Sequence, residues 1–353
     1  MATDLIPREV DLNSAGADFW RRYHAFRRVR HAEVKPDDPF TPDDLEQRRL
    51  LFDLKYEIND CFEVVRDGEM VAWLRTAATR PGAPGYEDNR SFLWCFGSVL
   101  APYRRQGIAR RFLAIVLELM DRHEYRFVTS ESEEEPGHAF FKWLGAPVKS
   151  TGAENRLRMA DVDWSMVRRW IEEGDRRNPQ TKLERYDDHI PDSMLEQYAP
   201  HLEALLNTMP WDHLEHGRIA VTPESLRDEY RHMDAGGAKH YTVLTREPDG
   251  VISGITDILW APHREKILQQ LFTGVLPSAR GRGIGKWIKA DMIERMHRLY
   301  PEAEWIATGN ADSNGPMLAI NHRLGFKRHR WGAEYQLSRD ELAARLEALK
   351  VRA

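Results

Sequence analysis

Residues 271–296, LFTGVLPSARGRGIGKWIKADMIERM, decide the fold of this 353-residue chain. They begin with a short apolar run of β-prone residues, which Pro277 ends. The turn RGRGIG then opens a helical pattern with apolar residues along one side. Glycines let the backbone approach an anion closely, and the unpaired N–H groups of a helix's first turn point at it. Arg280, Arg282 and Lys286 add charged donors, so the stretch predicts a phosphate-binding loop.

The spacing of this loop separates it from two common phosphate-binding motifs. A P-loop has four residues between its glycines and a serine or threonine after its lysine, and both features are missing here. A dinucleotide fingerprint reads G-x-G-x-x-G, whereas this loop reads G-x-G-x-G. The loop instead contains the pattern R-x-x-G-x-G, formed by Arg280, Gly283 and Gly285. A nucleoside triphosphate is therefore disfavoured as the ligand.

Composition bounds the class of protein. With 42% apolar and 30% charged residues the chain is typical of soluble globular proteins, and its length favours two domains. A net charge of −5 favours neither nucleic acid nor an anionic membrane as partner. Cys61 and Cys95 are the two cysteines, too few for a disulfide framework. The start lacks the pattern of a secretory signal, and no apolar run approaches the ~18 residues of a membrane span, so we expect a cytoplasmic protein.

The chain contains an internal duplication. Four features recur in the same order at offsets between 176 and 182 residues. The pairs are Thr41-Pro42 with Thr222-Pro223, Asp67-Gly68 with Asp249-Gly250, Val99 and Arg104 with Val275 and Arg280, and Leu144-Gly145 with Leu324-Gly325. Matching features at nearly one offset predict two copies of one domain. The copies are expected at residues 1–160 and 178–353, with a linker helix in 161–177.

Hydrophobic periodicity and turn residues predict the main elements. Strands are expected at residues 61–66, 69–78, 92–100, 125–130, 240–246 and 251–260. Helices are expected at 17–31, after an N-cap at Thr41, at 164–173 with an end at Gly174, and from Ser338 with Glu341 at N3.

Five arginines on the helix expected at residues 17–31 admit two interpretations. They are Arg21, Arg22, Arg27, Arg28 and Arg30. They could contact the phosphates of a nucleic acid or another ligand, or they could form a solvated helix face. Runs of charge usually have the second role, so we expect no nucleic acid partner.

The loop and a second segment together carry a family resemblance. Residues 308–314, TGNADSN, lead into 317–326, MLAINHRLGF, which ends in Leu-Gly-Phe. With R-x-x-G-x-G, these motifs resemble the GNAT superfamily of acyl-CoA N-acyltransferases, in its tandem, mycothiol-synthase-like form. The resemblance implies an α/β chain of two tandem GNAT-like domains, each a mixed twisted sheet flanked by helices. Two central strands of each sheet would separate to admit the pantetheine arm of the ligand.

The resemblance also implies the ligand, acetyl-CoA or another acyl-CoA, with no metal. In the second copy the implied contacts are Val275, Leu276, Arg280, Gly281, Arg282, Gly283, Ile284, Gly285, Lys286, Asn310 and Asn314. In the first copy they are Val99, Leu100, Arg104, Arg105, Gln106, Gly107, Ile108, Ala109 and Arg110. The first copy departs from the family pattern, with Glu134 at the place of Asn314 and Ala146 at the place of Phe326. We therefore expect the second copy to be the catalytic one.

Acyl transfer to an amine needs a base more than an acid. Deprotonating a lysine-like amine of pKa ~10.4 at pH 7 costs about 4.6 kcal/mol, whereas releasing a thiolate of pKa ~8.5 costs about 2 kcal/mol. The family's common glutamate is missing, with Gln269 and Gln270 in its region, so Asp257 is the candidate base. The family's tyrosine acid is replaced by Asn321, which can only support through hydrogen bonds, and by Phe141 in the first copy.

The acceptor is expected to be the amine of a small molecule. His213, Glu215 and His216 follow Pro210 in a loop-like segment and either line the acceptor site or form an ordinary surface cluster. The histidines show no ligand spacing with cysteines, so no metal site is predicted. The alternative function is a CoA-binding sensor or partner-binding protein without activity. The sequence leaves the oligomeric state open.

Overall fold

The structure is a computed structural model that describes residues 5–351. The first four residues of the start, from which the absence of a secretory signal was predicted, lie outside this range. The chain divides into two compact units. Unit 1 comprises Met1–Ser150, His213–Arg218 and Gly332–Ala353, and unit 2 comprises Thr151–Asp212 and Ile219–Trp331. Neither unit is one continuous half of the sequence.

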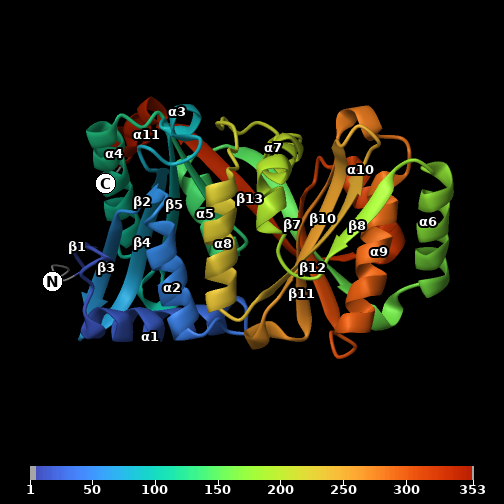
Figure 1. Cartoon of the computed structure of the whole chain (residues 1–353). Coiled ribbons are helices and arrows are strands. Elements are labelled where there is room, and N and C mark those ends of the chain that lie inside the picture. The colour runs from blue at the N-terminus through green and yellow to red at the C-terminus, as the bar shows by residue number, and fades with distance from the viewer. Residues whose placement is uncertain (1–4, 352–353) are drawn as a thin grey trace. The chain divides into compact units, whose positions relative to one another are not determined.

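Unit 1 is built on a mixed sheet in which β5 and β6 run parallel and the other neighbours antiparallel (Figure 1). Its order is β1 (Arg8–Val10), β3 (Cys61–Arg66), β4 (Glu69–Thr79), β5 (Phe92–Val99), β6 (Phe127–Ser132) and β13 (Lys327–Ser338), with β2 (Glu57–Ile58) beside β4. Its helices are α1 (Ala17–Val34), α2 (Asp43–Asp53), α3 (Tyr86–Asn89), η1 (Ala101–Tyr103), α4 (Ile108–His123), α5 (Glu135–Leu144) and α11 (Arg339–Val351).

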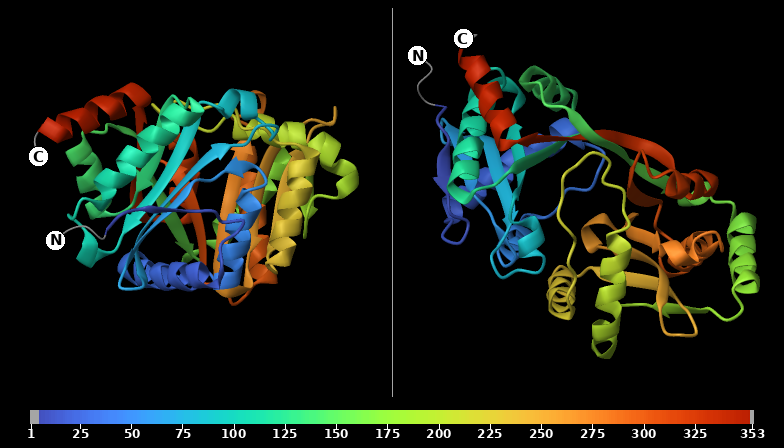
Figure 2. Two further views of the ribbon diagram at one scale, coloured as in Figure 1. Left: turned by 90° about the vertical axis from the view of Figure 1, so that its left-hand side faces the viewer. Right: turned by 90° about the horizontal axis from the view of Figure 1, so that it is seen from above.

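Both faces of this sheet are covered by apolar helix faces. Trp73 of β4 packs with α1, and the next residue, Leu74, packs with α4, as the alternation of a strand requires. Helix α11, coloured red, lies alongside α4 and adds Leu342 to the same core (Figure 2). The hairpin of β3 and β4 turns at Asp67-Gly68, where both residues have positive φ, which confirms the predicted turn.

Unit 2 repeats this plan around the parallel pair β11 and β12. Its sheet order is β7 (Val148–Arg158), β12 (Trp305–Ala311), β11 (Ile267–Val275), β10 (Ile252–Trp260), β9 (Lys239–Arg246) and β8 (Lys182–Tyr186). Its helices are η2 (Met159–Asp161), α6 (Trp164–Arg177), η3 (Asp192–Met194), α7 (Leu195–Leu206), α8 (Pro223–Ala235), η4 (Pro262–Arg264), η5 (Pro277–Ala279), α9 (Ile284–Leu299) and α10 (Gly315–Leu324). Helices α6 and α9 lie on one side of the sheet, and α7 and α8 on the other (Figure 1).

The two copies have exchanged their last strands. Strand β7 follows α5 of the first copy in sequence but pairs with β12 of unit 2. Strand β13 follows α10 of the second copy but pairs with β6 of unit 1. The contact units therefore divide near residues 150 and 331, whereas the division at residues 161–177 remains our proposal for the boundary between the sequence copies.

Two helix boundaries differ from the prediction. Helix α6 does not end at Gly174 but continues to Arg177, because Gly174 serves as a packing contact for Trp287 of α9. Helix α2 has Pro42 at its N-cap and no side-chain cap, whereas Thr222 caps α8 in a full capping box with Ser225. Cys61 and Cys95 are both free. None of the helices within residues 5–351 is long and apolar enough to cross a membrane.

Replacing Gly174 by alanine should destabilise unit 2. The added Cβ would lie 2.2 Å from Cγ of the buried Trp287, which must shift. Overpacking of this kind costs about 1–3 kcal/mol, which urea unfolding of the variant would measure. Gly309→Ala is the matched control, since a Cβ there meets nothing within 4 Å. Equal stability of the two variants would contradict this packing role.

Candidate functional site

The two predicted phosphate loops have the same backbone. Arg105 and Gly281 have φ of 63° and 81°, and Gly107 and Gly283 have φ of 83° and 84°. Gly107 is the N-cap of α4, and Gly283 is the N-cap of α9. The left-handed conformation favours glycine, so the non-glycine Arg105 is strained there. Both loops thus end at a helix N-terminus, where backbone N–H groups and the helix dipole favour an anion.

The same side-chain contact braces each of the two loops. Arg104 Nε donates to Val99 O at 3.0 Å, and Arg280 Nε donates to Val275 O at 3.2 Å. This bond closes the turn between the strand and the helix in both units. Leu100 and Leu276 begin the turn at equivalent positions. The repeat found in the sequence is therefore a repeat of loop geometry.

The positively charged side chains of the two loops have different partners. In unit 2 Arg282 bonds to Glu247 at 3.0 Å and to Thr181 at 2.7 Å, and Lys286 Nζ lies 5.5 Å from the centre of the Trp170 ring. In unit 1, within the described chain, the side chains of Arg105 and Arg110 have no ion-pair or hydrogen-bond partner. Gln106, at the position of Arg282, donates to Pro102 O at 3.0 Å. The loop of unit 1 therefore keeps two side chains available for an anion.

A cavity of about 860 Å³ lies beside the loop of unit 1. Strands β5 and β6 pair only from Phe92 to Trp94 and then separate, which leaves one backbone edge of β5 unpaired by β6. Seven predicted contacts line the cavity: Val99, Arg104, Arg105, Gly107, Ile108, Ala109 and Arg110. Ser98 also lines it, and its buried Oγ has no partner within the described residues. The unpaired strand edge and this hydroxyl are suited to the amide groups of an extended ligand.

Small residues keep this cavity open. Gly97 on β5 and Ala146 after α5 line it together with Leu113 of α4. Their counterparts in the second copy, by loop and Leu-Gly spacing, are Thr273, Phe326 and Lys289. Cys95 lines it too, and burial raises the pKa of this thiol to about 12. At neutral pH Cys95 is therefore a wall residue and not a nucleophilic thiolate.

Larger polar side chains occupy the matching region of unit 2. Lys289 is 1% exposed, and its Nζ donates to Gln270 Oε1 at 2.6 Å and lies 5.1 Å from the centre of the Phe326 ring. Gln270 Nε2 donates to Thr256 at 2.8 Å and to Thr273 at 3.0 Å. These side chains form one buried, hydrogen-bonded group beneath α9. The replacement of Leu113 and Gly97 by lysine and threonine explains why the two units differ here.

The buried Lys289 should make the stability of unit 2 depend on pH. Burial lowers its pKa from 10.5 to about 7. Between these values the unfolded chain carries the proton and the folded one does not, so the free energy of unfolding should rise with pH by up to about 1.4 kcal/mol per unit. Urea unfolding from pH 7 to 9 should show this slope, and Lys289→Met should remove it. Equal slopes for both proteins would contradict the lowered pKa.

Asp257, the predicted base, is buried in unit 2 on the face covered by α7 and α8. Its Oδ2 lies 3.1 Å from His240 Nε2, and its Oδ1 accepts from the backbone N–H of Phe272 at 2.8 Å. The second bond forms where the pairing of β10 with β11 shifts after Asp257. His240 is therefore the partner that orients this carboxylate.

The predicted asparagines of unit 2 are brought together in part. Asn321 is fully buried, and its Nδ2 donates to Asn310 Oδ1 at 2.8 Å. Asn155, from the exchanged strand β7, donates to the same oxygen at 3.3 Å. Asn314 instead caps α10 by accepting from the N–H of Met317 at 3.4 Å. Asn310 is thus positioned by two neighbours, whereas Asn314 has a local helix-capping contact.

Sequence reasoning missed Tyr335, which lines the cavity of unit 1 from the exchanged strand β13. Its ring stacks on that of Phe141 at 4.1 Å, and its hydroxyl lies 2.8 Å from His138 Nδ1. Burial raises the pKa of Tyr335, so it is protonated at neutral pH. Nothing in the sequence pattern signalled this residue, because it lies almost 200 positions from Phe141.

Charged residues of both signs line the cavity. Arg30, one of the five arginines of α1, bonds to Glu33 and Glu134, and Arg104 bonds to Glu33 at 3.0 Å. Lys35 pairs with Glu133 at 3.1 Å. The other four arginines of that run also form ion pairs, with Glu63, Glu69 and Asp43.

The expected acceptor segment belongs to unit 1 by its contacts. The N–H of Glu215 donates to Gln336 Oε1 at 2.8 Å, and the N–H of His213 donates to Lys149 O at 3.1 Å. His216 Nδ1 lies 2.8 Å from Gly217 O. The backbone of this segment is thus held in place, and its role toward an acceptor stays a prediction.

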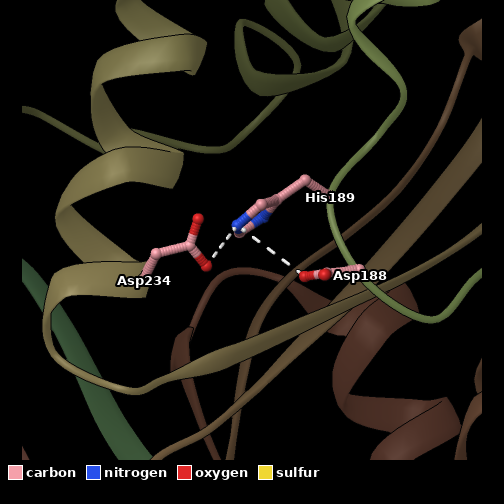
Figure 3. Close-up of side chains that lie close together, drawn as sticks. All are labelled: Asp188, His189 and Asp234. Atoms are coloured by element: carbon pink, nitrogen blue, oxygen red, sulfur yellow. Dashed lines mark hydrogen bonds and ion pairs between the residues drawn. The ribbon is translucent and has the colours of Figure 1, made fainter.

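Three potential metal ligands meet on unit 2, away from the sequence predictions. His189 Nε2 lies 3.0 Å from Asp234 and 3.7 Å from Asp188 (Figure 3). The His189 ring also stacks on Tyr230 at 4.1 Å. Both carboxylates are half exposed, and the contacts are those of an ion-pair cluster. We assign no metal to it.

Comparisons with known proteins agree with the geometry. Residues 21–146 match the model of the Acetyltransferase (GNAT) family. A search of curated protein sequences found no match. A tandem GNAT protein from the clavulanic acid biosynthesis pathway is similar in structure, with a TM-score of 0.71, 19% identity, and coverage of 95% of this chain and 98% of its own. A GCN5-related N-acetyltransferase from Sphaerobacter thermophilus has a TM-score of 0.61 at 14% identity, over 95% of each chain.

A third solved structure shares the same fold. Saccharomyces cerevisiae N-myristoyltransferase, solved with bound myristoyl-CoA, has a TM-score of 0.56 at 10% identity. The match covers 95% of this chain and 79% of that one. These likenesses confirm the predicted fold class.

Proposed function

We propose that this protein is an acyl-CoA-dependent N-acyltransferase. The chain has the fold of tandem GNAT proteins, and its residues 21–146 match the GNAT family model. Its acceptor would be the amine of a small molecule. The observation that carries the proposal is the cavity of unit 1, which opens at a phosphate-type loop. A pocket of this volume is in the range of ligand sites in proteins.

The residues of unit 1 fit coenzyme A. The helix N-terminus at Gly107 and the side chains of Arg105 and Arg110 would hold its phosphates. The edge of β5 and the Ser98 hydroxyl, which lacks a partner in the described chain, would bond to the amides of its pantetheine arm. Bound acyl-CoA would supply an activated thioester carbonyl. The protein's part is to orient it, exclude water and accept the proton of the amine.

Two placements of the transfer step are distinguishable. The cavity supports acyl-CoA in unit 1. The sequence pattern instead assigns catalysis to the second copy, with Asp257 as base and Asn321 in a supporting role. That assignment stays our prediction, and the oriented Asp257–His240 pair supports it as a proton acceptor.

Binding and turnover assays on the full chain test the function. Calorimetry with CoA, acetyl-CoA, longer acyl-CoA thioesters, ATP and NAD should show binding of the CoA compounds alone. Release of free thiol should then depend on an added amine across a panel of acceptors. ATP binding without CoA binding would overturn the proposal. CoA binding without turnover on any amine would favour the sensor function.

Replacing Asp257 by asparagine tests the second placement. Loss of a general base should lower turnover by ~10²–10⁴-fold, most severely at neutral pH where amines are protonated. Asn321→Ala should cost less, because it removes a hydrogen bond and not a proton acceptor. Asp234→Asn, at an exposed carboxylate of unit 2, is the matched control. Normal turnover by Asp257→Asn would place the base elsewhere.

A further inference from the structure

The cavity of unit 1 extends into the hydrophobic core. Leu74 of β4, Val116 of α4 and Leu342 of α11 line it and are each at most 1% exposed. Leu144 and Leu337 also line it and are buried. These residues lie beneath α4, in the same core cluster. The cavity is therefore more than a surface groove along the loop.

The wall of the cavity contains both charged and apolar residues. The charged residues come from the loop and from its neighbours, as with Arg105, Arg110 and Glu133. The deep wall is made of aliphatic and aromatic side chains from β4, α4, α5, β13 and α11. A ligand that fills both parts has an anionic end and an apolar end. The volume of about 860 Å³ belongs to the cavity as a whole, and its aliphatic and aromatic walls favour the burial of methylene groups.

The second copy has different side chains at the matching positions. There Phe326 and Lys289 stand at the positions of Ala146 and Leu113, and both are buried. Lys289 also brings a hydrogen-bonded polar group into that region. Unit 1 has aliphatic and small residues at these positions and an open cavity. The two units differ in these side chains, whereas the φ angles of the two loops are similar.

We propose that unit 1 takes a long, unbranched acyl chain, as in a fatty acyl-CoA, with the chain beneath α4 among Leu74, Val116 and Leu342. This rests on the proposed function, since it names the acyl group of that same ligand. The apolar depth would be filled by methylene groups, which need no hydrogen-bond partners. An acetyl group would leave that space empty. The loop would hold the nucleotide end as already described.

The inference predicts how affinity depends on chain length. Each pair of methylenes fully buried strengthens binding by up to ~15-fold. Calorimetry with straight-chain CoA thioesters of two to sixteen carbons, below their micelle concentrations, should give a dissociation constant that falls by several-fold for each two carbons. The fall should stop where the cavity is full. Calorimetry reads binding directly and does not depend on turnover.

A variant that copies the second unit locates the chain. In Ala146→Phe the dissociation constant should stop falling at a shorter acyl chain than in the unsubstituted protein. Ala146→Leu should shorten this limit less. Leu51→Phe is the control, because Leu51 lies on the exposed side of α2 and does not line the cavity. If Ala146→Phe does not fold, the dependence of the dissociation constant on chain length in the unsubstituted protein still tests the proposal.

Two failures are distinguishable. Acetyl-CoA that binds as tightly as the longer thioesters would overturn the long-chain inference and leave the proposed function intact. A chain that binds neither CoA nor any of its thioesters would overturn both. A chain-length series that Ala146→Phe and Ala146→Leu leave unchanged would place the acyl chain outside this cavity.

Discussion

A chain that ends at Trp331 should lose the tertiary structure of unit 1. It lacks the part of β13 that pairs with β6, and it lacks α11. Leu337, Leu342 and Leu346 are buried in the core beneath α4 and would be removed. Burial of three such side chains contributes about 5–9 kcal/mol at ~1.5–3 kcal/mol each, which is comparable with the whole stability of a domain.

Unfolding experiments check this expectation. The truncated chain should lose near-UV circular dichroism from the tryptophans of unit 1, lose acyl-CoA binding and show a weakened urea transition. A chain ending at Leu349 is the control, since it keeps β13 and nearly all of α11. If the chain ending at Trp331 unfolds at the same midpoint as the full chain, the exchanged strand is dispensable and the unit assignment is wrong.

Replacing Gly107 by valine should abolish acyl-CoA binding in unit 1. Gly107 has φ of 83°, which a β-branched residue cannot adopt without strain, so the loop must move the N–H groups at the start of α4. Each bond to a charged group contributes about 1.5–3 kcal/mol, so losing three of them weakens binding by ~10³–10⁶-fold. Calorimetry with the tightest-binding thioester measures the loss.

Gly283→Val provides the matched comparison, because the second loop has the same φ at its helix N-cap. The cavity beside the loop of unit 1 predicts that Gly107→Val weakens binding more than Gly283→Val does. The sequence pattern, with its full G-x-G-x-G loop and its asparagines, gives Gly283 the larger effect on turnover. If Gly283→Val alone silences both binding and turnover, acyl-CoA is held by the second copy and the cavity of unit 1 has another role.

The local elements of this protein could be predicted from its sequence. The turns at Asp67-Gly68 and Asp249-Gly250, the strands beside them and the glycine loops lie where the pattern indicated. These features depend on φ preferences and on apolar periodicity over a few residues, which the sequence displays directly. The duplication followed from the same local signals, and the tandem fold followed from the family resemblance of the sequence motifs.

Helix ends that depend on distant contacts could not be predicted in this way. Gly174 reads as a C-cap, yet α6 passes through it because Trp287, more than a hundred residues away, needs the space. Thr41 has the sequence pattern of an N-cap, yet helix α2 starts after Pro42. The carbonyl oxygen of Thr41 instead accepts a hydrogen bond from the side chain of Arg27. In both cases a tertiary contact overrides the local preference.

The candidate site also has parts that the sequence predicts and parts that only the tertiary structure shows. The sequence by itself determined the loops, because their shape follows from Gly107, Gly283 and the neighbouring arginines. Only the tertiary structure showed that the loop of unit 1 adjoins a cavity. Ala146 looked like a departure from the family pattern, yet its small side chain is one of those that leave the cavity open. Tyr335 reaches that cavity through a strand exchanged between the copies. Pairing between segments so far apart depends on the complementarity of whole surfaces, which no local pattern records.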